Sequence, residues 1–182
     1  MYPQKPSALV IVDIQERLVA AMQKDEISAA IKKCEILLSS CAILGVPAIF
    51  TEQYPKGLGC TVPELKKYLP SSGFLCEKSA FSCFGSEEFA GKIREMKLSS
   101  IIITGIETHV CVQQTAFDAL SEGLSVFIPY DAVSSRKDND KQCALRLMSS
   151  AGITVTGTES LLFSLLKDSA HPHFKEISKL LK

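Results

Sequence analysis

The chain has 182 residues, of which 46% are hydrophobic and 22% are charged. This composition excludes an intrinsically disordered chain, because enough apolar surface is available to build a core, and the length predicts a single domain over residues 1–182. Twenty basic residues balance twenty acidic ones, so no net field attracts nucleic acid or an anionic membrane, and we predict neither as a partner.

Six short runs rich in β-branched residues are predicted to form strands. In chain order they are 8–12, 46–50, 74–76, 100–104, 124–128 and 153–155. Most of these runs are apolar at every position rather than at alternate ones, which indicates strands that are buried on both faces. Such strands are typical of a parallel sheet that helices cover on both sides.

Segments with a helical spacing of apolar residues lie between and after these runs. The spacing is clearest over 27–41 and 143–151, weaker over 88–98 and 110–120, and present again in 160–166 and 174–181. This alternation of strand and helix predicts an α/β fold of three layers (α/β/α), in which helices cover both faces of a doubly wound, Rossmann-like sheet.

The cysteines and the apolar runs bear on the compartment. Seven cysteines are an odd number without the dense spacing of a small secreted scaffold, which favours free thiols in a reducing environment. No apolar run reaches the ~18 residues that a membrane helix needs, and the start of the chain lacks the core of a signal peptide. We therefore predict a cytoplasmic protein without a membrane partner, with a mitochondrial location as the alternative.

Three groups able to do chemistry follow predicted strands. Asp13 ends the first strand, Lys78 follows the third, and Cys111 lies near the start of the helix that follows the fourth. Ligands of open α/β sheets bind beyond the carboxyl ends of the strands. The three groups are therefore predicted to face one rim of the sheet.

A helix N-terminus and a nearby ammonium group both favour thiolate over thiol, so we expect the pKa of Cys111 to be lowered. With Asp13 as base and Lys78 as electrostatic stabiliser, the three residues make a nucleophilic site. Each also has a structural explanation. A cysteine in an apolar helix is commonly a small core residue, Asp13 with Glu16 fits a helix capping box, and Lys78 fits a solvated surface charge.

Four ordered motifs decide between these explanations. They are Ala8-Leu-Val-Ile-Val-Asp-Ile-Gln15, Thr51-Glu-Gln-Tyr-Pro-Lys-Gly-Leu-Gly59, Glu77-Lys-Ser-Ala-Phe-Ser82 and Thr104-Gly-Ile-Glu-Thr-His-Val-Cys-Val112. Through these motifs nearly the whole chain resembles the isochorismatase-like cysteine hydrolases. The segment 51–59 is most similar to the eukaryotic isochorismatase-domain-containing subgroup.

The resemblance implies a six-stranded parallel sheet of order 3-2-1-4-5-6 and a catalytic triad of Asp13, Lys78 and Cys111. It also implies a cis peptide between Ile106 and Glu107. The Glu107 N–H would then point toward the nucleophile and hold an oxyanion together with the N–H of Cys111. The implied activity is hydrolysis of a small amide or a related C–N carbonyl compound through a thioester on Cys111, with Asp13 as the base.

Two departures from the family narrow this activity. Nicotinamidase-like members carry an Asp-x-His metal motif after the second strand, whereas 50–54 reads Phe-Thr-Glu-Gln-Tyr and contains no histidine. We therefore predict no metal and no other cofactor. Bacterial isochorismatases that cleave an enol ether tend to lack the cysteine, so Cys111 favours acyl chemistry.

Specificity for a small-molecule substrate is predicted to come from side chains in the same rim loops. The candidates are Gln15, Glu52, Tyr54, Phe81 and Thr108. His109 stands two residues before Cys111, and neither strand nor helix geometry makes such neighbours face each other, which disfavours a Cys–His dyad. The family also implies a homo-oligomer. The rival interpretation is a catalytically silent binding or scaffold protein that keeps this fold.

Overall fold

A single twisted sheet forms the middle layer of the protein. The computed structural model describes residue 3 and residues 6–69 and 74–182. Within these residues the strands are β1 Ser7–Val12, β2 Ala48–Gln53, β3 Phe74–Lys78, β4 Ser100–Ile106, β5 Ser125–Pro129, β6 Val133–Ser134 and β7 Thr154–Thr156. Each of the six predicted runs overlaps one of them.

All strand pairs in this sheet are parallel, and the order is β3-β2-β1-β4-β5-β7. The predicted order is confirmed, because β7 is the sixth of the predicted runs. One strand is additional: β6 pairs with the carboxyl end of β4, through Gly105 with Val133 and Ile106 with Ser134. Two residues are too few to give a periodic pattern, so the sequence does not predict β6.

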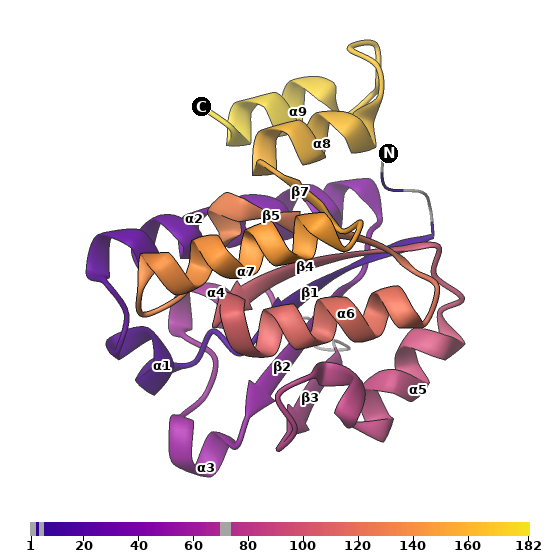
Figure 1. Ribbon diagram of the computed structural model, residues 1–182. Coiled ribbons are helices and arrows are strands. Elements are labelled where there is room, and N and C mark those ends of the chain that lie inside the picture. The colour runs from indigo at the N-terminus through magenta and orange to yellow at the C-terminus, as the bar shows by residue number, and fades with distance from the viewer. Residues whose placement is uncertain (1–2, 4–5, 70–73) are drawn as a thin grey trace.

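Helices cover both faces of the sheet (Figure 1). Their bounds are α1 Glu16–Ala20, α2 Lys24–Leu44, α3 Pro55–Leu58, α4 Pro63–Lys66, α5 Glu87–Glu95, α6 Gln113–Ser121, α7 Asp138–Ser150, α8 Thr158–Leu166 and α9 Phe174–Leu180. Figure 1 shows α5, α6 and α7 on one face and α2 on the other, as the three-layer prediction requires. In the described part of the chain, no helix has the length and apolarity to cross a membrane.

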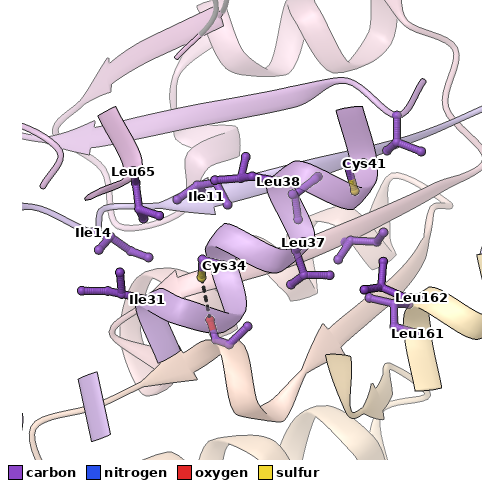
Figure 2. Packing of buried hydrophobic residues seen from close by; sticks show 14 of the residues in the cluster. Ile11, Ile14, Ile31, Cys34, Leu37, Leu38, Cys41, Leu65, Leu161 and Leu162 are labelled. Carbon is purple, nitrogen blue, oxygen red and sulfur yellow. Dashed lines mark hydrogen bonds between the residues drawn. The ribbon is translucent and has the colours of Figure 1, made fainter. Parts of the chain in front are cut away.

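The longest helix, α2, supplies the core of one face. Its buried side chains pack against β1 and against α4 and α8, and Figure 2 shows Cys34, Leu37 and Leu38 from α2 beside Ile11 and Leu162. Burying each aliphatic side chain of this size contributes about 1.5–3 kcal/mol. This face therefore holds β1 rigidly and fixes where β1 ends.

The opposite face has its own apolar core. Phe89 of α5, Ala116 of α6 and Met148 of α7 are buried against Val10 of β1 and Ile103 of β4. Alternate residues of β1 and β4 thus point into different cores, which explains why these strands are apolar throughout. The polar residues that follow them lie at the carboxyl edge of the sheet.

Strand register aligns that edge. Val12 of β1 is paired with Thr51 of β2 on one side and with Gly105 of β4 on the other. Lys78 at the end of β3 is paired with Gln53 at the end of β2. Four neighbouring strands therefore end at one rim.

Candidate active site

Asp13 lies directly after β1, with its side chain completely buried. Its backbone adopts a left-handed conformation with φ of 50°, which aspartate tolerates better than most residues and which turns the chain out of the sheet. The capping-box alternative is not adopted. Helix α1 begins at Glu16 with Gln15 as its N-cap, and no side chain caps it.

The Asp13 carboxylate is instead paired with Lys78. Nζ of Lys78 donates to Oδ2 of Asp13 at 2.6 Å, and the two side chains are 1% and 0% exposed. The interpretation of Lys78 as a solvated surface charge is therefore wrong. Residues from β1 and β3 form a buried ion pair at the rim, with β2 between them.

Further acceptors surround the Lys78 ammonium group. Nζ also donates to Oε1 of Gln53 at 2.7 Å and to the carbonyl oxygens of Ala80 and Phe81 at 3.2 and 3.0 Å. Burial by itself would lower the pKa of Lys78, but the negative charge of the Asp13 carboxylate and the hydrogen bond to it outweigh burial, and the net pKa is raised. Lys78 is therefore positively charged throughout the neutral pH range.

Cys111 lies in a π-helical turn, Thr108–Val112, that leads directly into α6. The residue is 6% exposed. Burial, followed by the negative charge of Asp13 and a hydrogen bond to Asp13, raises the pKa of Cys111 to about 12, although Lys78 acts in the opposite direction. The prediction of a lowered pKa is wrong, because position at a helix start does not reveal how deeply the sulfur is buried. The thiol holds its proton at rest.

The segment between β4 and this turn passes close to β1. Gly105 has φ of 113°, and a Cβ atom at this position would lie 2.1 Å from the carbonyl oxygen of Val12. Only glycine permits this approach. The peptide bond between Ile106 and Glu107 is cis. The predicted oxyanion segment therefore lies between the end of β1 and the turn that carries Cys111.

The Glu107 side chain is tied to the chain beyond β6. Its Oε2 accepts hydrogen bonds from Nε and from the backbone N–H of Arg136, at 3.0 and 3.1 Å. Burial alone would raise the pKa of Glu107, but the hydrogen bonds and charge of Arg136 outweigh it and lower the pKa. This ion pair anchors the segment from its outer side.

Two of the candidate specificity residues have structural roles. Gln15 is fully buried and uses its amide to bind the backbone of Gln53 and Gly59. Glu52 accepts two hydrogen bonds from Thr61, one from the backbone N–H and one from the hydroxyl. Both residues hold the rim loop 54–61 in place, and the Gln15 amide and Oε1 of Glu52 are engaged in doing so.

Of the other three candidates, two are exposed to solvent and one is buried. Tyr54 and Phe81 are 61% and 55% exposed. The backbone of each is hydrogen-bonded to Lys78, because the Tyr54 N–H donates to the Lys78 carbonyl and the Phe81 carbonyl accepts from Nζ of Lys78. Thr108 is fully buried, and within residues 6–69 and 74–182 its Oγ1 has no hydrogen-bond partner.

Two histidines, His109 and His173, have partners other than the Cys111 thiol. Nδ1 of His109 lies 2.9 Å from Oγ of Ser135, which occupies the ring nitrogen on that side. His173 pairs with Glu176 at 3.5 Å within the C-terminal segment. Among the residues placed by the structure, no group of three or more His, Cys, Asp or Glu side chains is arranged to hold a metal ion. Metal-binding relatives would use residues near β2 as ligands. Here Glu52 accepts a hydrogen bond from Thr61 and Gln53 accepts one from Lys78, so these residues do not fit a metal site.

Sequence reasoning missed two polar groups beside the triad. Thr51 donates from Oγ1 to Oδ1 of Asp13 at 2.7 Å, and Gln53 accepts from Lys78. Both belong to the carboxyl half of β2, where the sequence analysis assigned a role to Glu52 alone. Their position at the strand end was the available signal.

Comparison with known proteins places this arrangement in a family. The family model described as Isochorismatase domain matches residues 7–160. The chain is 39% identical to Isochorismatase domain-containing protein 1 of Danio rerio over 178 residues, which cover 97% of this chain and 61% of that protein. It thus spans about three fifths of that relative's length.

Solved structures show the same fold. The chain resembles the MAR1 ribonuclease from Caenorhabditis elegans with a TM-score of 0.88 and 38% identity, covering 100% of this chain and 91% of that chain. It also resembles the YcaC gene product from Escherichia coli, described as an octameric hydrolase of unknown specificity, with a TM-score of 0.83, 23% identity and coverage of 96% and 91%. The second likeness concerns the fold alone.

Proposed function

The chain belongs to the isochorismatase family, and on that premise we propose that it is a cysteine hydrolase that works without a metal and cleaves a small amide or a related C–N carbonyl compound. The observation that carries this proposal is the buried ion pair of Asp13 with Lys78 at the rim where Cys111 lies, with the Asp13 charge near enough to raise the pKa of the Cys111 thiol. A carboxylate beside a thiol is a base beside a nucleophile.

The raised pKa of Cys111 determines the order of proton transfer. Because the thiol is protonated at rest, Asp13 takes the S–H proton as the sulfur attacks the carbonyl carbon of the substrate. The electron pair of the C=O bond moves to oxygen and gives a tetrahedral oxyanion. The N–H groups of Glu107 and Cys111 stabilise this oxyanion, each by ~3 kcal/mol.

Collapse of the tetrahedral intermediate releases the amine. The C–N bond breaks, Asp13 gives its proton to the leaving nitrogen, and a thioester remains on Cys111. Water then attacks the thioester, Asp13 accepts the proton from water, and the departing sulfur regains a proton from Asp13. Lys78 neutralises the carboxylate throughout and limits the negative charge that builds up beside the sulfur.

The exposed rings of Tyr54 and Phe81 support substrate binding at this rim, where they offer apolar contact at the entrance. We also propose that the chain forms a homo-oligomer. The octameric hydrolase of the same fold supports this, and light scattering that gives the mass of one chain would refute it.

A screen of small primary amides and N-carbamoyl compounds tests the proposal, with ammonia release as the readout. We expect wild type to release ammonia from at least one compound and Cys111→Ala to release none. Cys34→Ala is the matched control, because Cys34 is also buried with a pKa raised to about 12 but lies on the other face of the sheet, and it should retain activity.

The relatives define the competing outcomes. The MAR1 relative is named a ribonuclease, so an RNA substrate belongs in the same screen, although a net charge of zero gives no general affinity for a polyanion. If Cys111→Ala still cleaves RNA, the protein is a ribonuclease that does not use Cys111, and the cysteine hydrolase proposal is wrong. Absence of turnover in every assay, together with unchanged biological effects of Cys111→Ala, would favour the scaffold interpretation.

A further inference from the structure

Both oxygens of the Asp13 carboxylate are held by donors from neighbouring strands. Oγ1 of Thr51 in β2 donates to Oδ1 at 2.7 Å, and Nζ of Lys78 in β3 donates to Oδ2 at 2.6 Å. Thr51 is 1% exposed, so no solvent competes for its hydroxyl. Two fixed donors prevent rotation of the carboxylate about its Cβ–Cγ bond.

A third residue fixes the direction of the Thr51 hydroxyl. Sγ of Cys83 lies 3.8 Å from Oγ1 of Thr51 as a donor, and the backbone N–H of Cys83 donates to Oγ1 of Thr115 at 3.0 Å. Burial raises the pKa of Cys83 to about 12, so this thiol keeps its proton to donate. The single Thr51 proton is therefore directed to Asp13, which as an ionised carboxylate only accepts.

We propose that Thr51 is a positioning residue, which orients the Asp13 carboxylate toward the Cys111 thiol. This inference rests on the proposed function, since it assigns Thr51 a role through Asp13 as base. A base must be held in the right geometry to take a proton efficiently. Without the Thr51 hydrogen bond, the Asp13 carboxylate points less accurately at the sulfur.

The groups facing Asp13 come from four elements. They are Thr51 from β2, Lys78 from β3, Cys83 from the 3₁₀ turn Cys83–Gly85 and Cys111 from the π-helical turn. Lys78 is the one cation among them, and the two cysteines are protonated at neutral pH. The rate of Cys111 alkylation at neutral pH therefore reports how well the Asp13 carboxylate is placed to take the thiol proton.

Alkylation of Cys111 by iodoacetamide tests the inference without a known substrate, because this reagent is itself a small primary amide. Rates are measured from about pH 4 to about pH 9, with the modified cysteine identified by peptide mass spectrometry. We expect Thr51→Val to slow Cys111 alkylation roughly 10- to 100-fold at neutral pH and to make the rate rise more steeply with pH, as for an unassisted thiol. Thr51→Ser, which keeps the hydroxyl, should restore both the rate and its weak dependence on pH.

Thr104→Val is the matched control. Thr104 is also a fully buried strand threonine, but its hydroxyl donates to the backbone carbonyl of Val10. It should lose a comparable amount of stability and leave the Cys111 profile unchanged. The inference is overturned if Thr51→Val and Thr104→Val show the same Cys111 alkylation rate or the same dependence of that rate on pH. It is also overturned if Thr51→Ser behaves like Thr51→Val.

Failure of the proposed function gives a different result. In that case the alkylation rate of wild-type Cys111 itself rises about tenfold for each pH unit, as for an unassisted thiol, whatever residue stands at position 51. If Thr51→Val does not fold, Thr51→Ala and Thr51→Ser carry the same comparison, with circular dichroism confirming that both are folded.

Discussion

Nζ of Lys78 lies 2.6 Å from Oδ2 of Asp13, although 65 residues separate the two in the chain. Neither side chain reaches solvent in a measurable way. A buried ion pair of this kind is costly to break on one side, because the remaining charge is left without a partner in a medium of low dielectric.

Loss of one partner should therefore destabilise the fold. We expect Lys78→Met to lower the free energy of unfolding by about 3–5 kcal/mol and the double change Asp13→Asn with Lys78→Met to cost less than that. Urea denaturation measures both. Lys92→Met is the control, because Lys92 and Glu95 form an exposed pair worth about 1 kcal/mol or less. Equal costs for Lys78→Met and Lys92→Met would contradict the buried pair.

A second prediction follows from the close approach of β4 to β1 at Gly105. Gly105→Ala would place a Cβ atom 2.1 Å from the Val12 carbonyl oxygen, which the sheet cannot relieve locally. We expect a loss of more than about 3 kcal/mol in unfolding free energy. Gly123→Ala shares the positive φ but meets nothing within 4 Å, so it should cost only about 1–2 kcal/mol. The two variants behaving alike would show that the approach does not matter.

The exposed rings at the rim should affect binding more than chemistry. For the amide identified in the screen, Tyr54→Ala and Phe81→Ala should raise KM several-fold, about 1 kcal/mol each, with a smaller change in kcat. Tyr130→Ala is the control, because Tyr130 is 51% exposed but follows β5 and lies outside the rim loops of the triad. An unchanged KM in both rim variants would remove these rings from the substrate site.

The pKa of Glu107 predicts a pH dependence of stability. Arg136 lowers this pKa in the folded state, so ionised Glu107 stabilises the fold above its ordinary pKa of 4.5, and this contribution is lost as pH falls through the lower folded value. Glu107→Gln should therefore be less stable than wild type at pH 7, by about 1 kcal/mol or less because Arg136 is exposed, and the gap should close in acid.

Thermal unfolding across the acidic range measures that gap. Glu87→Gln is the control, since the Glu87–Arg94 pair is almost fully exposed and should give little difference at any pH. A gap between Glu107→Gln and wild type that widens as pH falls would contradict the assigned direction of the pKa shift.

The sheet was predictable because its strands are buried on both faces and therefore apolar at every position. That pattern located β1 and β4, and the rule that ligands bind at carboxyl ends brought Asp13, Lys78 and Cys111 to one rim. The two-residue strand β6 carried no pattern. The capping box that Asp13 and Glu16 offered as an alternative is not adopted: Gln15 stands at the N-cap position of α1 without a side-chain cap, and Asp13 pairs with Lys78.

The pKa values of the site residues depend on how deeply each residue is buried, and no local sequence pattern records burial. A cysteine at a helix start predicts a lowered pKa, but the enclosing side chains reverse its direction at Cys111. Thr51 was overlooked for a similar reason, because threonine is an ordinary strand residue and only its register beside Val12 places its hydroxyl against Asp13.

The pH dependence of Cys111 alkylation by iodoacetamide in the wild-type chain tests the central claim most directly, with exposed Cys60 and Cys143 as internal references. If Asp13 removes the thiol proton during attack, the alkylation rate of Cys111 stays nearly constant with pH through neutrality. The rate also exceeds that of an unassisted thiol with a pKa of about 12. A Cys111 rate that instead rises about tenfold for each pH unit through neutrality, as for an unassisted thiol, would contradict the account.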